Sequence, residues 1–410
     1  AWHNGGDYRR STLSAAQTIS RLLWVPELLP GESEKLPSLL KPQERVKGLP
    51  DILVEARWGL DWLMRMMDEA GGVSLGLGPA PDDAFMPPQI PPQDDVLHNY
   101  IGAPHTCNTA KAGAVLARAS RLFKKHDASF AASCLEAAQK AWSWLETHPD
   151  PTEIPHKSTC QIYVVNQDAM DRIWLAIELF RTTGEAKYHA AFRKRCAALD
   201  RKFTPRKPST QTMRIDSSRE ALLSYALDSR ADAQIKAKIL SDLKASCDAM
   251  IRRSDSAGYG NILPREYWKH RHTIGNNLHL AFELLILHHL TGDLDSLRVA
   301  RRQLDYILGA NPLDKLFITG MEPNGIRAPH YRPYSIRQLA PVGLTVKGPT
   351  HDRQFLQKVY KDKGRPVPPP MKAYFDRRTD HWCNEPDVEV QGYLVLFSGY
   401  RHFTAAEAAK

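Results

Sequence analysis

The sequence has 410 residues, of which 42% are hydrophobic, and a formal net charge of +9 at pH 7. This length suits two average domains or one large helical barrel, and no run of about 18 apolar residues predicts a membrane span. The basic residues are dispersed and belong to no recognisable nucleic-acid-binding module, so the charge alone does not indicate a nucleic-acid partner.

A glycine-rich motif, Trp2-His3-Asn4-Gly5-Gly6-Asp7-Tyr8, opens the sequence. Glycines beside a carboxylate let the backbone turn tightly and approach a ligand closely. Taken alone, the motif is also compatible with an ordinary turn that carries an Asp cap. Because the sequence starts inside this motif, we expect that an upstream piece, including part of the first helix, is absent.

Helical periodicity dominates the rest of the chain. Apolar residues recur at spacings of three and four, the pattern of one buried helix face. Two segments, 178–185 and 283–293, repeat a helix end, a Thr-Gly pair that suits a left-handed cap, and an acidic residue that suits the next helix N-terminus. The predicted helices and hairpins are Leu49–Met67, Ala110–Phe123, Ala128–Thr147, Ser217–Ile251, Ile274–Leu290 and Val388–Ala406.

Helical hairpins that each expose an apolar face must pack against one another. We therefore predict an all-α fold, an (α/α)6 barrel of six hairpins, with an open solenoid as the alternative. Two proline-rich segments interrupt the helical pattern: Gly71–Pro104 contains seven prolines and Gly309–Asp380 contains ten. Long irregular segments inside a domain are usually functional, so we expect these loops to form one rim of a cleft.

Two further motifs lie in or after the second proline-rich segment. Ala328-Pro329-His330-Tyr331-Arg332-Pro333 frames a His and an Arg with prolines, and Asp376 is followed by Trp382-Cys383-Asn384-Glu385 just before the last helix. Each has a structural interpretation, as a solvated loop or as an acidic residue at a helix N-terminus. Together with Asp7 they supply the two carboxyls that glycoside hydrolysis needs, provided that the barrel brings the chain ends together.

In these motifs the sequence resembles glycoside hydrolase family 9, and the resemblance runs over essentially the whole chain. Trp2–Tyr8 resembles the family's opening motif W-H-D-A-G-D-Y, except at Asn4 and Gly5. Further similar segments are Pro50–Leu53 with Glu55–Trp58, Asp305–Pro312, the P-H-x-R signature on Pro329, His330 and Arg332, and an Asp nine residues before the catalytic Glu, here Asp376 and Glu385.

The resemblance implies an inverting, endo-β-1,4-glucanase-like hydrolase on an (α/α)6 barrel. Asp7 falls on the family's general base and Glu385 on its general acid, kept protonated here by partial burial. We expect Asn4 to orient the attacking water and Asp376 to support the Glu385 loop. The expected substrate-binding residues are His330 and Arg332, with Trp2, Tyr8, Trp268 and Trp382 as sugar platforms and Glu389 as an extra carboxylate.

Two departures from the family pattern leave alternatives open. Asn4 stands where the family usually has an Asp, and Glu389 lies in a segment that differs from the family's V-T-I-N-W-N-A. These changes leave room for an exo-acting β-glycosidase of the same fold on another sugar, for example a β-glucosaminide. Asn4 also leaves room for a carbohydrate-binding protein with weakened catalysis.

The expected partner is an oligo- or polysaccharide, with neither nucleic acid nor a membrane as partner. The chemistry requires no cofactor; the resemblance allows a structural calcium ion, but the sequence indicates no metal site. We expect residues 1–410 to form a single catalytic domain, and we expect a secreted or periplasmic protein because polymers must be cut outside the cytoplasm. The sequence predicts neither the oligomeric state nor endo or exo action.

Overall fold

The computed structural model describes residues 2–79, 99–152, 168–198, 217–269, 271–335 and 340–405. Most of these residues are helical, which confirms the predicted fold class. The helices of ten or more residues are α1 (Thr12–Leu28), α2 (Asp51–Arg65), α3 (Thr106–Phe123), α4 (Ala128–Thr147), α5 (Ala169–Thr183), α6 (Ala186–Ala198), α7 (Ser218–Leu227), α8 (Ala233–Ser256), α9 (Thr273–Thr291), α10 (Leu294–Ile307) and α13 (Val388–Phe403).

Shorter helical pieces lie mainly in the loops. They are α11 (Arg332–Ser335), α12 (Arg353–Val359) and the 3₁₀ turns Ser33–Lys35, Pro42–Glu44, Gly258–Gly260, Arg265–Tyr267 and Lys361–Lys363. Part of the first proline-rich segment, residues 80–98, lies outside the described residues, whereas most of the second is described as irregular chain around α11 and α12.

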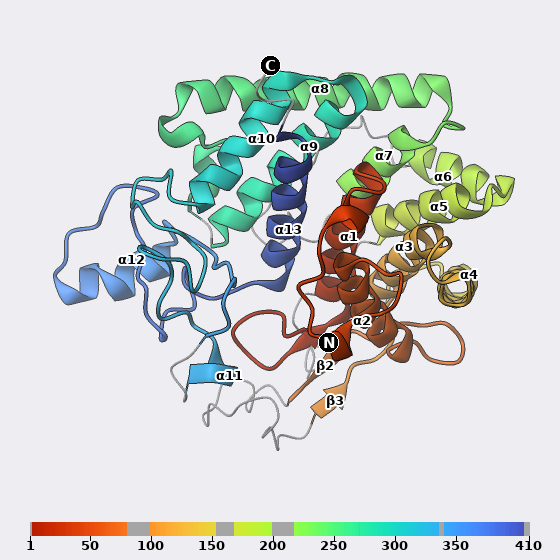
Figure 1. The fold of residues 1–410 in the computed structure, drawn as a ribbon, viewed down its shortest axis with the longest axis horizontal. Helices are drawn as coiled ribbons and strands as arrows, with labels where there is room; N and C mark the ends of the chain where they lie inside the picture. Colours follow the sequence, from red (N-terminus) through yellow and green to blue (C-terminus); the bar gives the residue numbers. More distant parts are fainter. Residues whose placement is uncertain are drawn as a thin grey trace.

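Six helices form a closed inner ring. Following the contacts round the ring, α1 packs on α3, α3 on α5, α5 on α7, α7 on α9, α9 on α13, and α13 returns to α1. Figure 1 shows the closure, with α1 and α13, the first and last long helices, side by side near the centre of the molecule. The prediction of an (α/α)6 barrel is therefore confirmed, and the open solenoid is wrong.

An outer layer of helices covers this ring. Helix α2 packs on α1, α4 on α3, α6 on α5, α8 on α7 and α9, and α10 on α9 and α13. Within the described ranges, the outer position between α13 and α1 holds no helix of this length. Helix α1 is an inner helix of 17 residues. It is buried on nearly every side, so its sequence lacks the three-and-four spacing of a helix with one buried face.

Buried charges line the contacts between the inner helices. Arg118 of α3 donates to Glu178 of α5 at 2.5 Å and lies 3.5 Å from Glu220 of α7, and all three side chains are at most 5% exposed. The guanidinium of Arg118 also lies 4.1 Å from the ring centre of Trp24 on α1. A buried ion is tolerated only when it is paired, so these contacts fix how the inner helices face one another.

The inner helices start at one end of the barrel. In their first turns, Asn108 of α3 donates to Thr12 of α1 at 2.7 Å, and Lys111 of α3 donates to Asp171 of α5 and to Ser217, the N-cap of α7, both at 2.5 Å. The segments that precede these helices therefore meet at the same end. That end carries both the opening motif and Glu385.

A small antiparallel sheet anchors the opening loop at this end. Its strands are β1 (Arg10–Ser11), β2 (Gly76–Pro79) and β3 (Asn99–Ile101), in the order β1-β2-β3. In this sheet Arg10 pairs with Leu77, which in turn pairs with Ile101. Since β1 follows Asp7 by only two residues, the sheet fixes where the carboxylate can lie.

Candidate active site

The two ends of the chain meet at Gly6 and Glu385. The Gly6 N–H donates to Glu385 Oε1 at 3.0 Å across 379 residues of sequence. The Gly6 carbonyl accepts from the Arg332 N–H at 2.9 Å, so the His330 loop joins the same contact. A Cβ at Gly6 would come within 2.0 Å of the His330 carbonyl oxygen. Only glycine permits this approach, which is the structural reason for the glycine-rich motif.

Glu385 lies in the segment just before α13 and is held from two sides. Its backbone carbonyl accepts from the Lys347 N–H at 3.0 Å, and its Oε2 accepts from the Lys347 ammonium. The side chains of Lys347 and Glu385 are only 10% and 16% exposed. Burial alone would raise the pKa of Glu385, but the ammonium of Lys347, aided by His330 and the Gly6 N–H, holds this pKa below its ordinary value.

Asp7 has the opposite electrostatic environment. Loss of hydration raises the pKa of Asp7, and the nearby negative charge of Glu385 raises it further, outweighing the Arg9 N–H and the charges of Arg9 and Arg332. The Arg9 N–H donates to Asp7 Oδ1 at 2.9 Å. We expected the pKa of Glu385 to be raised and Asp7 to stay ionised, but the surroundings shift the two pKa values in the opposite directions. The reason is Lys347, which the sequence did not indicate as a site residue.

Asn4 ties the opening loop to the start of α13. Its Oδ1 accepts from the Ser11 N–H at 2.7 Å, and its backbone carbonyl accepts from the Val388 N–H at 3.0 Å. Its Nδ2 is buried and has no hydrogen-bond partner within the described parts of the chain. A buried amide without a partner is costly, so this N–H is suited to bind a water or a ligand atom.

Asp376 organises the His330 loop. Its two carboxylate oxygens accept from the backbone N–H groups of Arg327 and Ala328, each at 2.9 Å, and from Lys315 at 3.1 Å. Asn384 donates to the same carboxylate at 3.3 Å. The contacts join the loop that carries His330 to the segment that carries Glu385. Asp376 thus has the location of a supporting residue.

His330 and Arg332 lie beside the two carboxyls. The His330 N–H donates to the Asn384 carbonyl at 2.8 Å, and its ring Nδ1 bonds the Arg378 carbonyl. With Nδ1 occupied, the other edge of the ring faces Gly6, where its Cδ2 would lie 2.9 Å from an added Cβ. The guanidinium of Arg332 is close enough to lower the pKa of Asp7.

Two of the expected sugar platforms, Trp268 and Trp382, are partly buried and make packing contacts. Trp382 lies among Phe355, His381 and the side chains of Arg271 and Lys358. Trp268 donates to the Leu263 carbonyl at 3.1 Å and packs against the hydrophobic core. Both rings are therefore part of the packing of the loops around the site.

The structure argues against two other substrate contacts. Tyr8 is 1% exposed, with its ring edge-on to His3, and so it offers no face to a sugar. Glu389 is 3% exposed within α13, and its charge acts on the buried guanidinium of Arg21. We expected Glu389 in the cleft, but the first turn of α13 directs it into the barrel wall.

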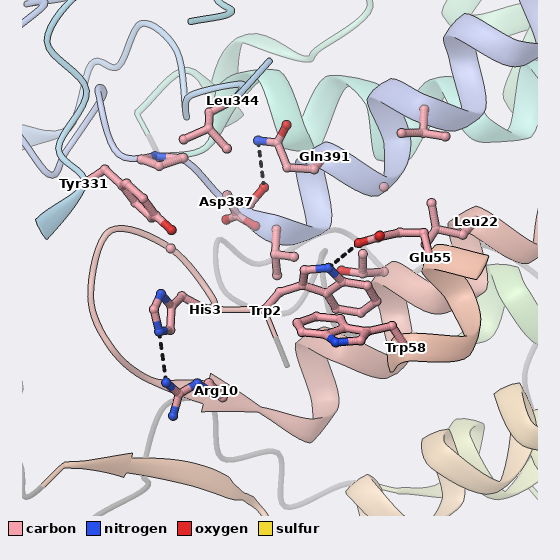
Figure 2. A pocket seen from close by; sticks show the side chains of 16 residues that line it. Trp2, His3, Arg10, Leu22, Glu55, Trp58, Tyr331, Leu344, Asp387 and Gln391 are labelled. Atoms are coloured by element: carbon pink, nitrogen blue, oxygen red, sulfur yellow. Dashed lines mark hydrogen bonds between the residues drawn. The ribbon is translucent and has the colours of Figure 1, made fainter. Parts of the chain in front are cut away.

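Trp2 lines a cavity of about 480 Å³ between α1, α2 and α13. In Figure 2, the rings of Trp2 and Trp58 lie edge to face, 5.3 Å apart, and the Trp2 indole donates to Glu55 at 2.6 Å. Trp58 is 47% exposed and was not expected to be a site residue. The carboxyls of Asp7 and Glu385 do not line this cavity, which borders the uncovered outer position of the barrel.

A further charged pair lies next to Glu385. His272, which precedes α9 with a φ of +65°, places its Nδ1 3.0 Å from Asp387, the N-cap of α13. His272 therefore makes a structural contact here. Within the described residues, no group of three His, Cys, Asp or Glu side chains is arranged to hold a metal ion. No described helix is both long and apolar enough to cross a membrane.

Comparison with known proteins gives one consistent picture. The sequence model of Glycosyl hydrolase family 9 matches residues 1–398. The chain is 25% identical to a cellodextrinase of Butyrivibrio fibrisolvens, over 96% of this chain and 73% of that protein. It is 24% identical to endoglucanase D of Acetivibrio thermocellus, where the match covers 81% of this chain and spans about half of the relative, 52%.

Solved structures agree with this picture. A metagenome-derived glycoside hydrolase family 9 endoglucanase superposes with a TM-score of 0.85 at 31% identity, covering 98% of this chain and 70% of that chain. The family 9 endoglucanase J30 superposes with a TM-score of 0.85 at 27% identity, covering 98% of this chain and 73% of that chain.

Proposed function

Because the chain belongs to glycosyl hydrolase family 9, we propose that it is an inverting glycosidase that cleaves β-1,4-linked glucan. The printed names of its relatives, a cellodextrinase and endoglucanases, support a glucan as substrate. The observation that carries the proposal is the contact of Gly6 with Glu385, which brings the Asp7 loop and the Glu385 loop to one site. Glycoside hydrolysis with inversion uses one carboxyl as acid and another as base on opposite faces of the sugar.

In the proposed mechanism, Glu385 donates a proton to the glycosidic oxygen while the bond to the anomeric carbon breaks. Asp7 removes a proton from a water that attacks the same carbon from the opposite face. The unpaired Nδ2 of Asn4 is the donor that we propose for this water. Arg332 and His330, which flank the two carboxyls, would orient sugar hydroxyls.

The partner of this site would be an oligo- or polysaccharide. We leave Tyr8 and Glu389 out of the proposed binding set because both are buried. The pair of Trp2 and Trp58, one of them exposed, is the aromatic surface closest to the opening motif. Because a polysaccharide must be cut outside the cytoplasm, we propose that the enzyme acts there.

The test is a reducing-sugar assay on cellulosic, xyloglucan, chito-configured and aryl β-glycoside substrates, with the product anomer followed by NMR. We expect release of the α-anomer from β-1,4-glucan. Turnover confined to chito-configured substrates would favour the exo-acting glycosidase on another sugar. Binding without turnover on every substrate would refute the proposed hydrolase activity and favour a binding protein.

Two variants separate the roles of the carboxyls. Glu385→Gln removes the acid, so we expect kcat to fall about 10²–10⁴-fold on natural glucan and much less on aryl glycosides with good leaving groups, which need little protonation. Asp7→Asn removes the base and should lower kcat on both kinds of substrate. Glu322→Gln is the matched control, since the Glu322 side chain is 80% exposed and has no part in the proposed mechanism. Equal losses on both substrates for Glu385→Gln would contradict its role as acid.

A further inference from the structure

Lys347 is fixed against Glu385 by backbone as well as side chain. Val346 and Pro386 form an antiparallel bridge, and the Lys347 N–H donates to the Glu385 carbonyl at 3.0 Å. The side chains emerge from these neighbouring segments, and the Lys347 ammonium bonds both Glu385 Oε2 and the His381 carbonyl, the latter at 3.2 Å. The backbone bridge therefore places Lys347 beside Glu385, so the ion pair is not a chance contact between mobile surface side chains.

Both oxygens of Glu385 accept hydrogen bonds. Oε1 accepts from the Gly6 N–H, and Oε2 accepts from Lys347. A carboxyl group that faces one amide donor and one ammonium is held in its ionised form, because these bonds favour the charged state. An ionised carboxylate has no proton to give to a glycosidic oxygen. The proposed acid therefore has to gain a proton before it can act.

The other titratable groups around the pair offer no better proton source. His381 has its pKa lowered to about 4 by burial, so it is neutral in mildly acidic and neutral solution. Asp7 must itself be ionised to act as the base. The remaining charged or titratable groups that face the pair are His330 from the 327–331 loop, Arg332 at the start of α11, and Cys383 with Asp380 in the segment before Glu385.

We propose that Lys347 is a positioning residue that holds the catalytic proton in reserve and passes it to Glu385 when a sugar fills the site. This inference rests on the proposed function, because it concerns the acid of that reaction. In the structure the ammonium and the carboxylate form an ion pair. When a sugar covers this pair, its two charges lose contact with solvent, and the neutral amine with the neutral carboxylic acid becomes the favoured form.

The proton balance closes over one turnover. A proton moves from Lys347 Nζ to Glu385, and from Glu385 to the glycosidic oxygen as its bond to the anomeric carbon breaks. The attacking water forms the new bond to that carbon and loses its proton to Asp7. After the products leave, Asp7 releases this proton to solvent and Lys347 takes one up, so the net reaction is the addition of one water.

Two substitutions at one position separate charge from proton donation. Lys347→Arg keeps the positive charge, but a guanidinium does not give up its proton in a protein. We expect it to hold Glu385 ionised and to lower kcat/KM on glucan at least 100-fold at every pH, with recovery on aryl glycosides that need no acid. Lys347→Met removes the ammonium, so burial alone then acts on Glu385 and lets it bind its own proton.

The pH profile of Lys347→Met carries the decisive readout. A lysine gives up its proton at far higher pH than a carboxylic acid does. We therefore expect Lys347→Met to be active at mildly acidic pH, with its alkaline limb about two pH units below that of the wild type. At pH 5, kcat/KM on glucan should be higher for Lys347→Met than for Lys347→Arg. If the positive charge alone were needed, Lys347→Arg would be the more active variant. Lys363→Met, on an exposed 3₁₀ turn, is the control.

Several outcomes would overturn the inference. If kcat/KM of Lys347→Arg on glucan were within threefold of the wild-type value, a positive charge at this position would be enough. If the alkaline limb of the pH profile of Lys347→Met stayed in place or moved to higher pH, Lys347 would store no proton. Infrared or ¹³C NMR titration of Glu385 in the wild-type protein needs no variant, and a protonated Glu385 in the empty enzyme at pH 6 would overturn it as well. A wild type inactive on every glycoside would instead refute the proposed function.

Discussion

Replacing Gly6 with alanine tests whether the close approach of the opening loop to Glu385 is required for activity. A Cβ added at Gly6 would lie 2.0 Å from the His330 carbonyl oxygen, 2.9 Å from the His330 ring and 3.1 Å from Glu385 Cγ. All three neighbouring atoms belong to residues of the proposed site, His330 and Glu385. The nearest is a backbone atom, which cannot swing aside as the end of a side chain can.

The size of the effect follows from the overlap. Real Cβ atoms essentially never come closer than 3.0 Å to another heavy atom, so the two segments must separate by 1.0 Å or more. Such a shift stretches the bond from the Gly6 N–H to Glu385 Oε1, now 3.0 Å, beyond hydrogen-bond range. A misplacement of about 1 Å costs roughly 100-fold in rate, and overpacking lowers the free energy of unfolding by about 1–3 kcal/mol.

The assay is kcat/KM on cello-oligosaccharides together with thermal unfolding. Gly5→Ala is the graded comparison, because its Cβ would meet the Pro386 carbonyl at 3.0 Å and should be tolerated better. Gly258→Ala is the control, since no heavy atom lies within 4 Å of its added Cβ. If Gly6→Ala and Gly258→Ala had the same activity and melting temperature, the inferred contact between the two loops would be refuted.

Three further predictions concern the charged groups. The pKa of Asp7 is raised, mainly by burial and then by Glu385, so kcat/KM should fall on acidification at a higher pH than for an ordinary aspartate. Glu385→Gln should move this fall to lower pH on aryl glycosides. If the fall did not move, the charge of Glu385 would not act on Asp7. Arg118→Met should lower the free energy of unfolding by about 3–5 kcal/mol in urea titrations, because the buried network loses the cation that contacts Glu27, Glu178 and Glu220; a cost below about 1 kcal/mol would contradict a stabilising role for these contacts. Asp376→Ala should lower kcat/KM about 10- to 100-fold with a smaller change in melting temperature, since the 327–330 loop loses the acceptor for its backbone N–H groups; wild-type kinetics would remove Asp376 from its supporting role.

The sequence predicts helices in which apolar residues recur at spacings of three and four. The spacing in Leu49–Met67 gives α2, observed as Asp51–Arg65, and Gly184 and Gly292 adopt the left-handed caps expected of them, with φ of +76° and +73°. Helix α1 escaped prediction because the inner ring buries almost every residue of it, and a helix buried all round has no polar face to set the period. Local pattern therefore identifies the inner helices α3, α9 and α13 but not α1.

The candidate site divides in a similar way. Asp7 and Glu385 stand in motifs with glycine, tryptophan and asparagine neighbours, so the sequence singles them out. Lys347 has no such context, and its contact with Glu385 depends on a backbone bridge between Val346 and Pro386 that no spacing reveals. The burial of Glu389 likewise depends on the direction of the first turn of α13, which is settled only by packing against α1 and Arg21.

The pairing of α1 with α13 has a consequence for how the protein is made. On the ribosome, α1 emerges long before α13, the helix that covers its flank, and Gly6 emerges 379 residues before Glu385. The nascent chain must therefore carry an incompletely covered apolar helix until α13 has been made, and such long-range closure is slow and prone to aggregation. A ribosome that stalls before α13 releases a chain that has neither a closed ring nor a complete pair of carboxyls.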